Sequence, residues 1–312
     1  MRVLLSIKLL LVASLSVLIS CTQVAYAPHS PVPVQTPVVQ ENLGEQVARH
    51  LTNRYADTRA NCGKDSQPSF LCSGIMLRGT SSNPTYHVWN NSPSAIAKGG
   101  VSFVYLRADT DFNRMPFSYN NGFIFETYFH ADGKLHPEVL CSFPMDAWTD
   151  SRDKAGCGQY PGYAGSDLCH LKGITTAAQW WADYNSHATN RNQSQCGFDV
   201  QDGRNTLAGP AFMASVLARG TSYLGNEGYG QNNELVVKVW SDNLGKTLPL
   251  EAFFYLYGTA GLPVAQRNQR DLKQTDGVLI PIISVRLAPT QTGIATFHYI
   301  ASDQTEPMPI VP

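Results

Sequence analysis

Short stretches rich in β-branched and aromatic residues recur along most of the chain, each of strand length and each bounded by polar or turn-forming residues. They predict strands over seven ranges: Gly74–Arg78, Val101–Leu106, Phe123–Phe129, Glu234–Trp240, Ala252–Tyr257, Val278–Leu287 and Ala295–Ile300.

Helical spacing of apolar residues is rarer. Val47, Leu51 and Tyr55 form the stripe of one short helix, and Thr176 followed by Gln179 is a capping-box pattern that begins another. Two further helices are expected over Leu207–Val216 and Leu262–Lys273. Because the strands outnumber the helices and do not alternate with them in a βαβ rhythm, the pattern predicts an α+β fold with a mixed or antiparallel sheet.

An apolar leader opens the chain. Arg2 and Lys8 come before the run Leu9–Ile19, which has about half the length that a membrane-spanning helix needs. The leader ends in Leu18-Ile19-Ser20-Cys21, which resembles the lipobox of bacterial lipoproteins. We therefore expect residues 1–21 to be an export signal, with a lipid anchor at Cys21 as the means of membrane attachment.

A second cleavage pattern, Ala25-Tyr26-Ala27, would instead release the protein to the outside, but Pro28 follows it and should hinder the peptidase. Residues 22–41 are rich in proline and predict a semi-rigid tether. A single folded domain is expected over residues 42–312.

The chain has seven cysteines, and six remain once Cys21 is set aside. An even number of thiols in an exported protein predicts three disulfides. Six cysteines allow fifteen pairings. We favour Cys62–Cys72, Cys141–Cys157 and Cys169–Cys196, with residues 141–196 as a disulfide-rich insertion.

Charge and motifs narrow the function. The net charge is −1 and only 15% of residues are charged, so the basic surface that nucleic-acid binding requires is missing. Asp109-x-Asp111-x-Asn113 imitates the start of a calcium loop, but Arg114 stands where glycine is required and Asn120 where a bidentate acid is required. We expect no bound metal and no nucleic-acid partner.

Two segments carry candidate chemistry. Arg78 ends an apolar strand and is followed by Gly79, so a guanidinium suited to phosphate stands where the backbone allows close approach. The polar loop Gly228–Asn233 delivers Glu234 onto the start of a strand, a rigid position that suits a catalytic carboxylate. The alternatives without a catalytic role are that Arg78 pairs with a surface acid and that Glu234 is a charge on an edge strand, where it prevents aggregation.

The order of these segments resembles the arginine–serine–glutamate class of ADP-ribosyltransferases and NAD-glycohydrolases. The matching positions are Arg78-Gly79, Ser102 on the next strand, and Asn232-x-Glu234. Residues 55–62, 101–109, 173–181 and 232–235 more specifically resemble the halovibrins, which are exported bacterial proteins of this kind.

The resemblance implies an ADP-ribosyltransferase-type sheet and an exported enzyme, a toxin, that cleaves the nicotinamide–ribose bond of NAD without a cofactor. Glu234 would stabilise the ribosyl cation, Arg78 would bind the pyrophosphate and Ser102 would support the glutamate, with Ser222 as a rival serine. Either Tyr229 or Phe103 would stack on nicotinamide.

The acceptor of the ADP-ribosyl group is open. Asn232 stands where arginine-modifying transferases have glutamate and asparagine-modifying ones glutamine, which favours water over a host protein. Two readings compete with an enzyme of this class. One is an envelope-anchored lipoprotein that binds a sugar or a host protein without catalysis, and the other is a disulfide-stabilised hydrolase of unrelated mechanism.

Overall fold

A computed structural model describes residues 42–62, 67–81, 86–110, 112–126, 139–145, 169–186, 196–199, 232–240, 250–290 and 292–300. The chain divides into two compact units, residues 1–40 and 41–312, and all described residues lie in the second. The predicted export signal, the anchor at Cys21 and the tether over residues 22–41 all lie outside the described residues. Within the described part of the chain, no helix combines the length and apolar character needed to cross a membrane.

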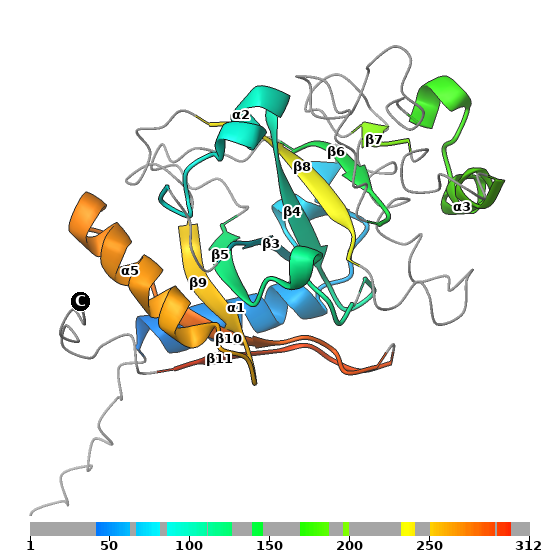
Figure 1. Ribbon diagram of the computed structural model, residues 1–312. Coiled ribbons are helices and arrows are strands. Elements are labelled where there is room, and N and C mark those ends of the chain that lie inside the picture. The colour runs from blue at the N-terminus through cyan, green and yellow to red at the C-terminus, as the bar shows by residue number, and fades with distance from the viewer. Residues whose placement is uncertain are drawn as a thin grey trace, which may run out of the picture. The chain divides into compact units, whose positions relative to one another are not determined.

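The centre of the fold is a nine-stranded sheet (Figure 1). In spatial order its strands are β11 (Thr296–Tyr299), β10 (Ile282–Arg286), β9 (Leu250–Leu256), β5 (Asn121–Phe125), β3 (Ile75–Gly79), β4 (Gly100–Leu106), β8 (Glu234–Lys238), β6 (Val139–Phe143) and β7 (Phe198–Asp199). Neighbouring strands are antiparallel except β9 and β10, which are parallel. A separate two-stranded ribbon joins β1 (Asn61–Cys62) to β2 (Gln67–Pro68). The chain is thus α+β with a mixed, mostly antiparallel sheet, as its pattern predicts.

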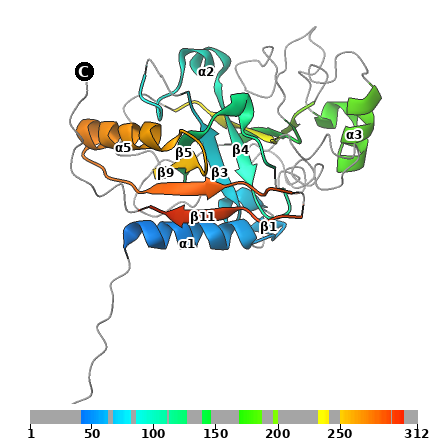
Figure 2. The ribbon, with the colours of Figure 1, turned by 60° about the horizontal axis from the view of Figure 1, so that its bottom comes forward.

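Four α-helices are described: α1 (Leu43–Ala56), α2 (Pro93–Lys98), α3 (Ala177–Ser186) and α5 (Leu262–Asp276). Three short 3₁₀ turns accompany them: η1 (Ser69–Leu71), η2 (Pro116–Ser118) and η3 (Cys169–Lys172). Helix α1 lies along β11 (Figure 2). Helix α5 packs on β9 and lies on the other side of the sheet.

Each face of the sheet has its own core. Leu51 and Tyr55 of α1 pack with Val104 of β4 on one face. Ala265 and Leu272 of α5 belong to the core that contains alternate residues of the same strand, such as Phe103. Burial of a side chain the size of leucine or phenylalanine contributes about 1.5–3 kcal/mol. The packing of α1 on one face and α5 on the other therefore stabilises the sheet from both sides.

Local signals in the sequence set the helix ends. The side chain of Asn42 accepts a hydrogen bond from the backbone N–H of Gly44 and so caps α1. The predicted capping box of α3 is confirmed, because the Gln179 side chain accepts from the Thr176 N–H while the Thr176 hydroxyl accepts from the Gln179 N–H. Helix α5 begins with a proline in its first turn and ends at Gly277, whose φ is 70°.

The seven predicted strands are confirmed, with shifts at their ends. The third begins earlier, at Asn121, and ends at Phe125, while residues 127–129 lie outside the described residues. The sixth begins later than predicted, at Ile282. Strand β6 and helix α2 were not predicted from the sequence. The helix expected over 207–216 lies outside the described residues.

Two predicted disulfides are confirmed, Cys62–Cys72 and Cys169–Cys196. Cys141 is also disulfide-bonded, but its predicted partner Cys157 lies outside the described residues. Disulfides of this kind indicate an oxidising compartment.

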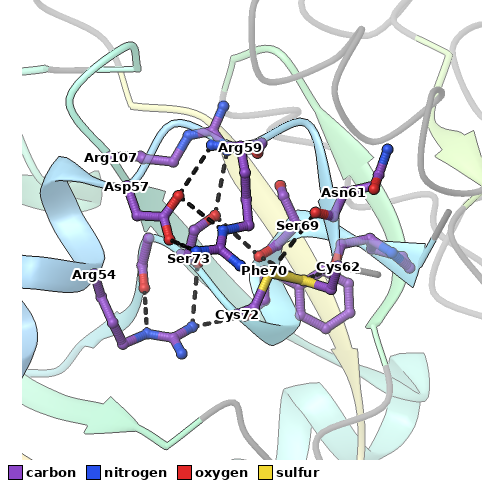
Figure 3. Close-up of a disulfide and its surroundings, with 12 residues drawn as sticks. Arg54, Asp57, Arg59, Asn61, Cys62, Ser69, Phe70, Cys72, Ser73 and Arg107 are labelled. Atoms are coloured by element: carbon purple, nitrogen blue, oxygen red, sulfur yellow. Dashed lines mark hydrogen bonds and ion pairs between the residues drawn. A yellow bond between two sulfur atoms is a disulfide. The ribbon is translucent and has the colours of Figure 1, made fainter. Parts of the chain in front are cut away.

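The Cys62–Cys72 disulfide lies beside a cluster of arginines (Figure 3). The buried guanidinium of Arg54 donates to the carbonyl oxygens of Phe70 and Gly74, directly before β3. The guanidinium of Arg107, at the end of β4, donates to both carboxylate oxygens of Asp109 at 2.6 Å. These contacts tie α1 and the start of β3 together and so fix the strand that carries Arg78.

Candidate functional site

Strands β3 and β4 part in the middle of the sheet. They pair only where Ile75–Leu77 of β3 lie opposite Val104–Leu106 of β4. Beyond Leu77, β3 continues to pair with β5, where Arg78 lies opposite Phe123. The first half of β4 pairs on its other side with β8, where Ser102 lies opposite Val236. The end of β3 and the start of β4 therefore separate at the position of Arg78.

Arg78 bridges the two strands where their backbone pairing stops. Its Nη1 atom donates to the carbonyl oxygen of Ser102 at 2.6 Å. The side chain is partly buried, so the guanidinium stands at the boundary between the sheet and solvent. A planar guanidinium in this position suits bidentate binding of a phosphate or carboxylate.

Ser102 and Glu234 are in direct contact. The Ser102 hydroxyl donates to Oε1 of Glu234 at 2.6 Å, the length of a hydrogen bond to a charged acceptor. The register explains the contact: Ser102 lies opposite Val236, so Glu234, two residues earlier on the same face of β8, is its diagonal neighbour. Glu234 is only 3% exposed, so few water molecules screen its carboxylate.

The two asparagines before Glu234 fix the point at which β8 begins. The Asn233 side chain accepts from the N–H of Tyr105 and donates to its carbonyl oxygen, both at 2.8 Å. It thus continues the hydrogen-bond ladder between β4 and β8 with an amide side chain. The Asn232 side chain donates to the Asn233 carbonyl at 2.9 Å and is buried.

Strand β8 lies between β4 and β6 and is not an edge strand. The reading of Glu234 as a charge that protects a sheet edge is therefore wrong. The Nη1 atom of Arg78 bonds a backbone carbonyl, and the reading of Arg78 as the partner of a surface acid stays an untested alternative.

A shallow pocket adjoins Arg78. It encloses about 370 Å³ including its open mouth. Its lining residues come from the end of β3, the segment before α2 and the residue after η2: Arg78, Gly79, Thr80, Ser81, Tyr86, Val88, Asn90, Ser92 and Tyr119. Gly79 is needed here, because a Cβ atom at this position would lie 2.9 Å from Tyr119 and 3.3 Å from Met115.

Phe103 does not have the stacking role suggested for it. Its ring is 1% exposed and packs in the core against Phe123, Phe125 and Trp240. Successive side chains of a strand point to opposite faces, so Phe103 lies on the face of β4 opposite to Ser102, where the core is. Tyr229 and the rival Ser222 lie outside the described residues.

Two hydrogen bonds connect Arg78, Ser102 and Glu234, which the sequence places 156 positions apart from first to last: Arg78 donates to the backbone carbonyl of Ser102, and the Ser102 side chain donates to Glu234. Sequence reasoning missed Asn233 and Tyr119. The only sequence signal for Asn233 is the pair of asparagines that directly precedes a strand. Among the residues that the structure describes, no group of three or more His, Cys, Asp or Glu side chains could hold a metal ion.

The site combines a buried carboxylate, a hydroxyl that orients it and a guanidinium at the solvent boundary. Such a set can stabilise developing positive charge while it binds an anionic group. No protein-family model matches the chain, and no curated protein matches it.

Proposed function

We propose that this protein cleaves the nicotinamide–ribose bond of NAD. The observation that carries the proposal is the 2.6 Å hydrogen bond from Ser102 to the buried carboxylate of Glu234, next to an arginine that bonds the same serine. The three residue types occur on neighbouring strands and in the order expected for the arginine–serine–glutamate class. The split between β3 and β4 gives the substrate a place where backbone pairing does not fill the sheet.

The chemistry follows from the charge that develops at the ribose. The bond between C1′ and the nicotinamide nitrogen breaks with both electrons going to the ring, which leaves as neutral nicotinamide, and the ribose becomes oxocarbenium-like. The Glu234 carboxylate stabilises this cation and accepts a hydrogen bond from the 2′-hydroxyl. Attack by water at C1′, with loss of its proton, completes the reaction to ADP-ribose.

Ser102 and Arg78 have supporting roles. The Ser102 hydroxyl donates to one oxygen of Glu234 and so orients the second oxygen for the ribose. Arg78 binds the pyrophosphate, whose two negative charges match a forked guanidinium. Because this contact is made before the bond breaks as well as during the reaction, it contributes to binding more than to turnover.

Water is the acceptor that the site supports best. The amide of Asn232 donates to the neighbouring Asn233 carbonyl and is buried. It is therefore engaged with the backbone and does not present its polar group to an incoming protein side chain. Transfer to a host protein stays the second candidate for the same first step.

The test is NAD turnover by the purified, oxidised protein, measured as release of nicotinamide and ADP-ribose. Glu234→Gln keeps size and hydrogen bonding but removes the charge, so kcat should fall about a hundredfold or more, since one electrostatic group of this kind supplies several kcal/mol. Binding of ADP-ribose should change little, because it carries no cationic centre.

Glu45→Gln is the matched control, since Glu45 is exposed in the first turn of α1 and should leave turnover unchanged. If folded Glu234→Gln protein turned over NAD at the wild-type rate, the carboxylate would have no part in the reaction. If the wild type left NAD intact, the proposal would be overturned, and the binding lipoprotein and the hydrolase of unrelated mechanism would be the readings that remain.

A further inference from the structure

Residues 86–92 form one wall of the pocket beside Arg78. We propose that this segment, the strap, narrows the pocket and must move outward before a substrate reaches Arg78. Its latch is the contact between His87 and Asp271. The assignment rests on the proposed function, in which Arg78 binds the pyrophosphate of NAD. It adds a control of substrate entry to the three residues of the site.

The pocket is too small for the group that Arg78 is proposed to bind. Without its open mouth it has a volume of about 40 Å³. That is room for about three water molecules, at roughly 10–15 Å³ each. Sites for small organic ligands have about 300–1,000 Å³. One wall must therefore move when the pyrophosphate of a dinucleotide binds beside this arginine.

The other walls are fixed by the sheet. Gly79 pairs with Gly122 of β5. Tyr119 packs so closely on Gly79 that an added Cβ atom would lie 2.9 Å from it. Thr80 donates to the side chain of Asn121 at 3.0 Å. Residues 86–92 belong to no helix or strand, so the strap is the wall that can move.

Alternate residues of the strap have different surroundings. Those that line the pocket are Tyr86, Val88, Asn90 and Ser92. The residues between them make the contacts that hold the strap in place: His87 with α5, and Trp89 and Asn91 with the chain just after β8. These contacts differ in burial from one end of the strap to the other.

The Asn91 end of the strap is held in the core. The Asn91 side chain donates to the Trp240 carbonyl and accepts from the Trp240 N–H. The Trp240 indole donates to the carbonyl oxygen of Trp89 at 3.1 Å. These three residues are 2–8% exposed, so breaking the bonds would leave buried polar groups without partners. This end is therefore the hinge.

The Tyr86 end is held at the surface. Nδ1 of His87 donates to Oδ2 of Asp271 at 2.6 Å, and the two side chains are 39% and 40% exposed. The imidazole also stacks on the ring of Trp89, with centroids 4.8 Å apart. A half-exposed pair of this kind is readily replaced by contacts with water and contributes little to stability. The strap therefore opens at this end, and Tyr86 moves with it.

The test is the direction in which affinity changes when the latch is removed. Asp271→Ala should lower KM for NAD about two- to fivefold, because binding no longer has to release an exposed pair. Calorimetry with inorganic pyrophosphate should show the same tightening. The value of kcat should stay within about twofold, because Ser102 and Glu234 are not among the residues that line the pocket. A brace with a purely structural role predicts the opposite sign, since its loss would raise KM.

His87→Ala removes the other partner of the latch and should also lower KM. The double variant should match His87→Ala, because the change at Asp271 then removes nothing further. Hydrogen exchange over residues 86–92 should be faster in Asp271→Ala than in the wild type. Gln274→Ala, exposed on the same helix, is the control and should match the wild type in every measurement.

Thermal melting checks that each variant folds, and Asp271→Ala decides alone if His87→Ala does not fold. An unchanged or higher KM in folded Asp271→Ala protein would overturn the strap. Exchange at the wild-type rate over residues 86–92 would also overturn it, because the latch would then hold nothing closed.

The two proposals fail separately. If the wild type does not cleave NAD but Asp271→Ala binds inorganic pyrophosphate more tightly, the proposed function is lost and the strap remains the gate of an anion site. If NAD is cleaved with the same KM by the wild type and Asp271→Ala, the function stands and the strap is lost. If neither NAD nor pyrophosphate binds to any variant, both proposals are overturned.

Discussion

Glu251 is a buried carboxyl group outside the proposed site. It lies on β9 beneath α1, with its Oε1 atom 3.6 Å from Nε2 of His50. Burial raises the pKa of Glu251 to about 8, a shift that Glu126 adds to and Arg54 opposes. At neutral pH this side chain is therefore protonated in the folded protein.

The raised pKa makes stability depend on pH with a defined sign. The unfolded chain loses the Glu251 proton near pH 4.5, whereas the folded protein keeps it up to about pH 8. Unfolding therefore releases a proton between these values, and stability falls as pH rises through that window. We expect Glu251→Gln, which cannot ionise, to be more stable than the wild type by roughly 1–3 kcal/mol at pH 8 and no more stable below pH 4.5.

Thermal melting from pH 4 to pH 9 measures this difference. Glu45→Gln, at an exposed position, serves as control and should follow the wild-type curve. Curves for Glu251→Gln and wild type that stay parallel over the whole range would show that Glu251 is ionised in the folded protein.

Single residues differ in how far the sequence reveals them. Arg78 and Glu234 could be singled out as candidates because each stands near one terminus of an apolar strand, a local signal. Asn233 could not, since its amide bonds the backbone of Tyr105, 128 positions away. Glu251 was also missed, because its burial depends on a helix from the other end of the chain covering β9.

At the level of elements, the start of β8 decides where the carboxylate of Glu234 lies. Asn233→Asp would replace the donor that faces the Tyr105 carbonyl with an oxygen. A buried acceptor then faces an acceptor, which should cost about 1–3 kcal/mol of stability and displace Glu234. NAD turnover should drop together with the melting temperature.

Asn53→Asp is the matched control, on the exposed side of α1, and should leave both quantities near the wild type. A folded Asn233→Asp protein with wild-type stability would show that the side-chain ladder does not hold β8.

Strands with alternating or continuous apolar residues could be predicted because their own composition marks them. Strand β6 escaped prediction because its five residues, Val139–Phe143, include a cysteine and a serine that become buried only through pairing with β7 and β8. The separation of β3 from β4 beyond Leu77 could not be predicted either, because it depends on how these strands pair with β5 and β8, which are distant in the sequence.

On the scale of the whole molecule, the residues around α3 form a core of their own. Trp180, Trp181 and Tyr184 pack with Phe198 and the Cys169–Cys196 disulfide, separately from the cores on the two faces of the sheet. Pairing of β7 with β6 joins this cluster to the sheet. The disulfide-rich segment was predicted from cysteine spacing, but its separate core was not.

Removing the Cys169–Cys196 disulfide by a double change to alanine should therefore loosen this cluster, at about 2–4 kcal/mol. The near-UV circular dichroism of the paired tryptophans should weaken, while NAD turnover at 25 °C stays within about threefold of wild type because the site residues lie on other strands.

A double change of Cys62 and Cys72 to alanine should affect turnover differently from the change at Cys169 and Cys196. The Cys62–Cys72 disulfide lies beside the arginines that hold the start of β3, so its loss should lower turnover and melting temperature together. Equal loss of turnover in both double variants would show that the α3 cluster supports the site as well.

The amide of Asn233 has a consequence for how this chain can change over time. Because that one side chain binds both backbone groups of Tyr105, the position of Glu234 is set from Asn233 onward and not by the chain before it. Connections of different length and composition can precede Asn232 without moving the carboxylate. Insertions and deletions should therefore accumulate upstream of this residue, while substitutions of Asn233 itself are removed by selection.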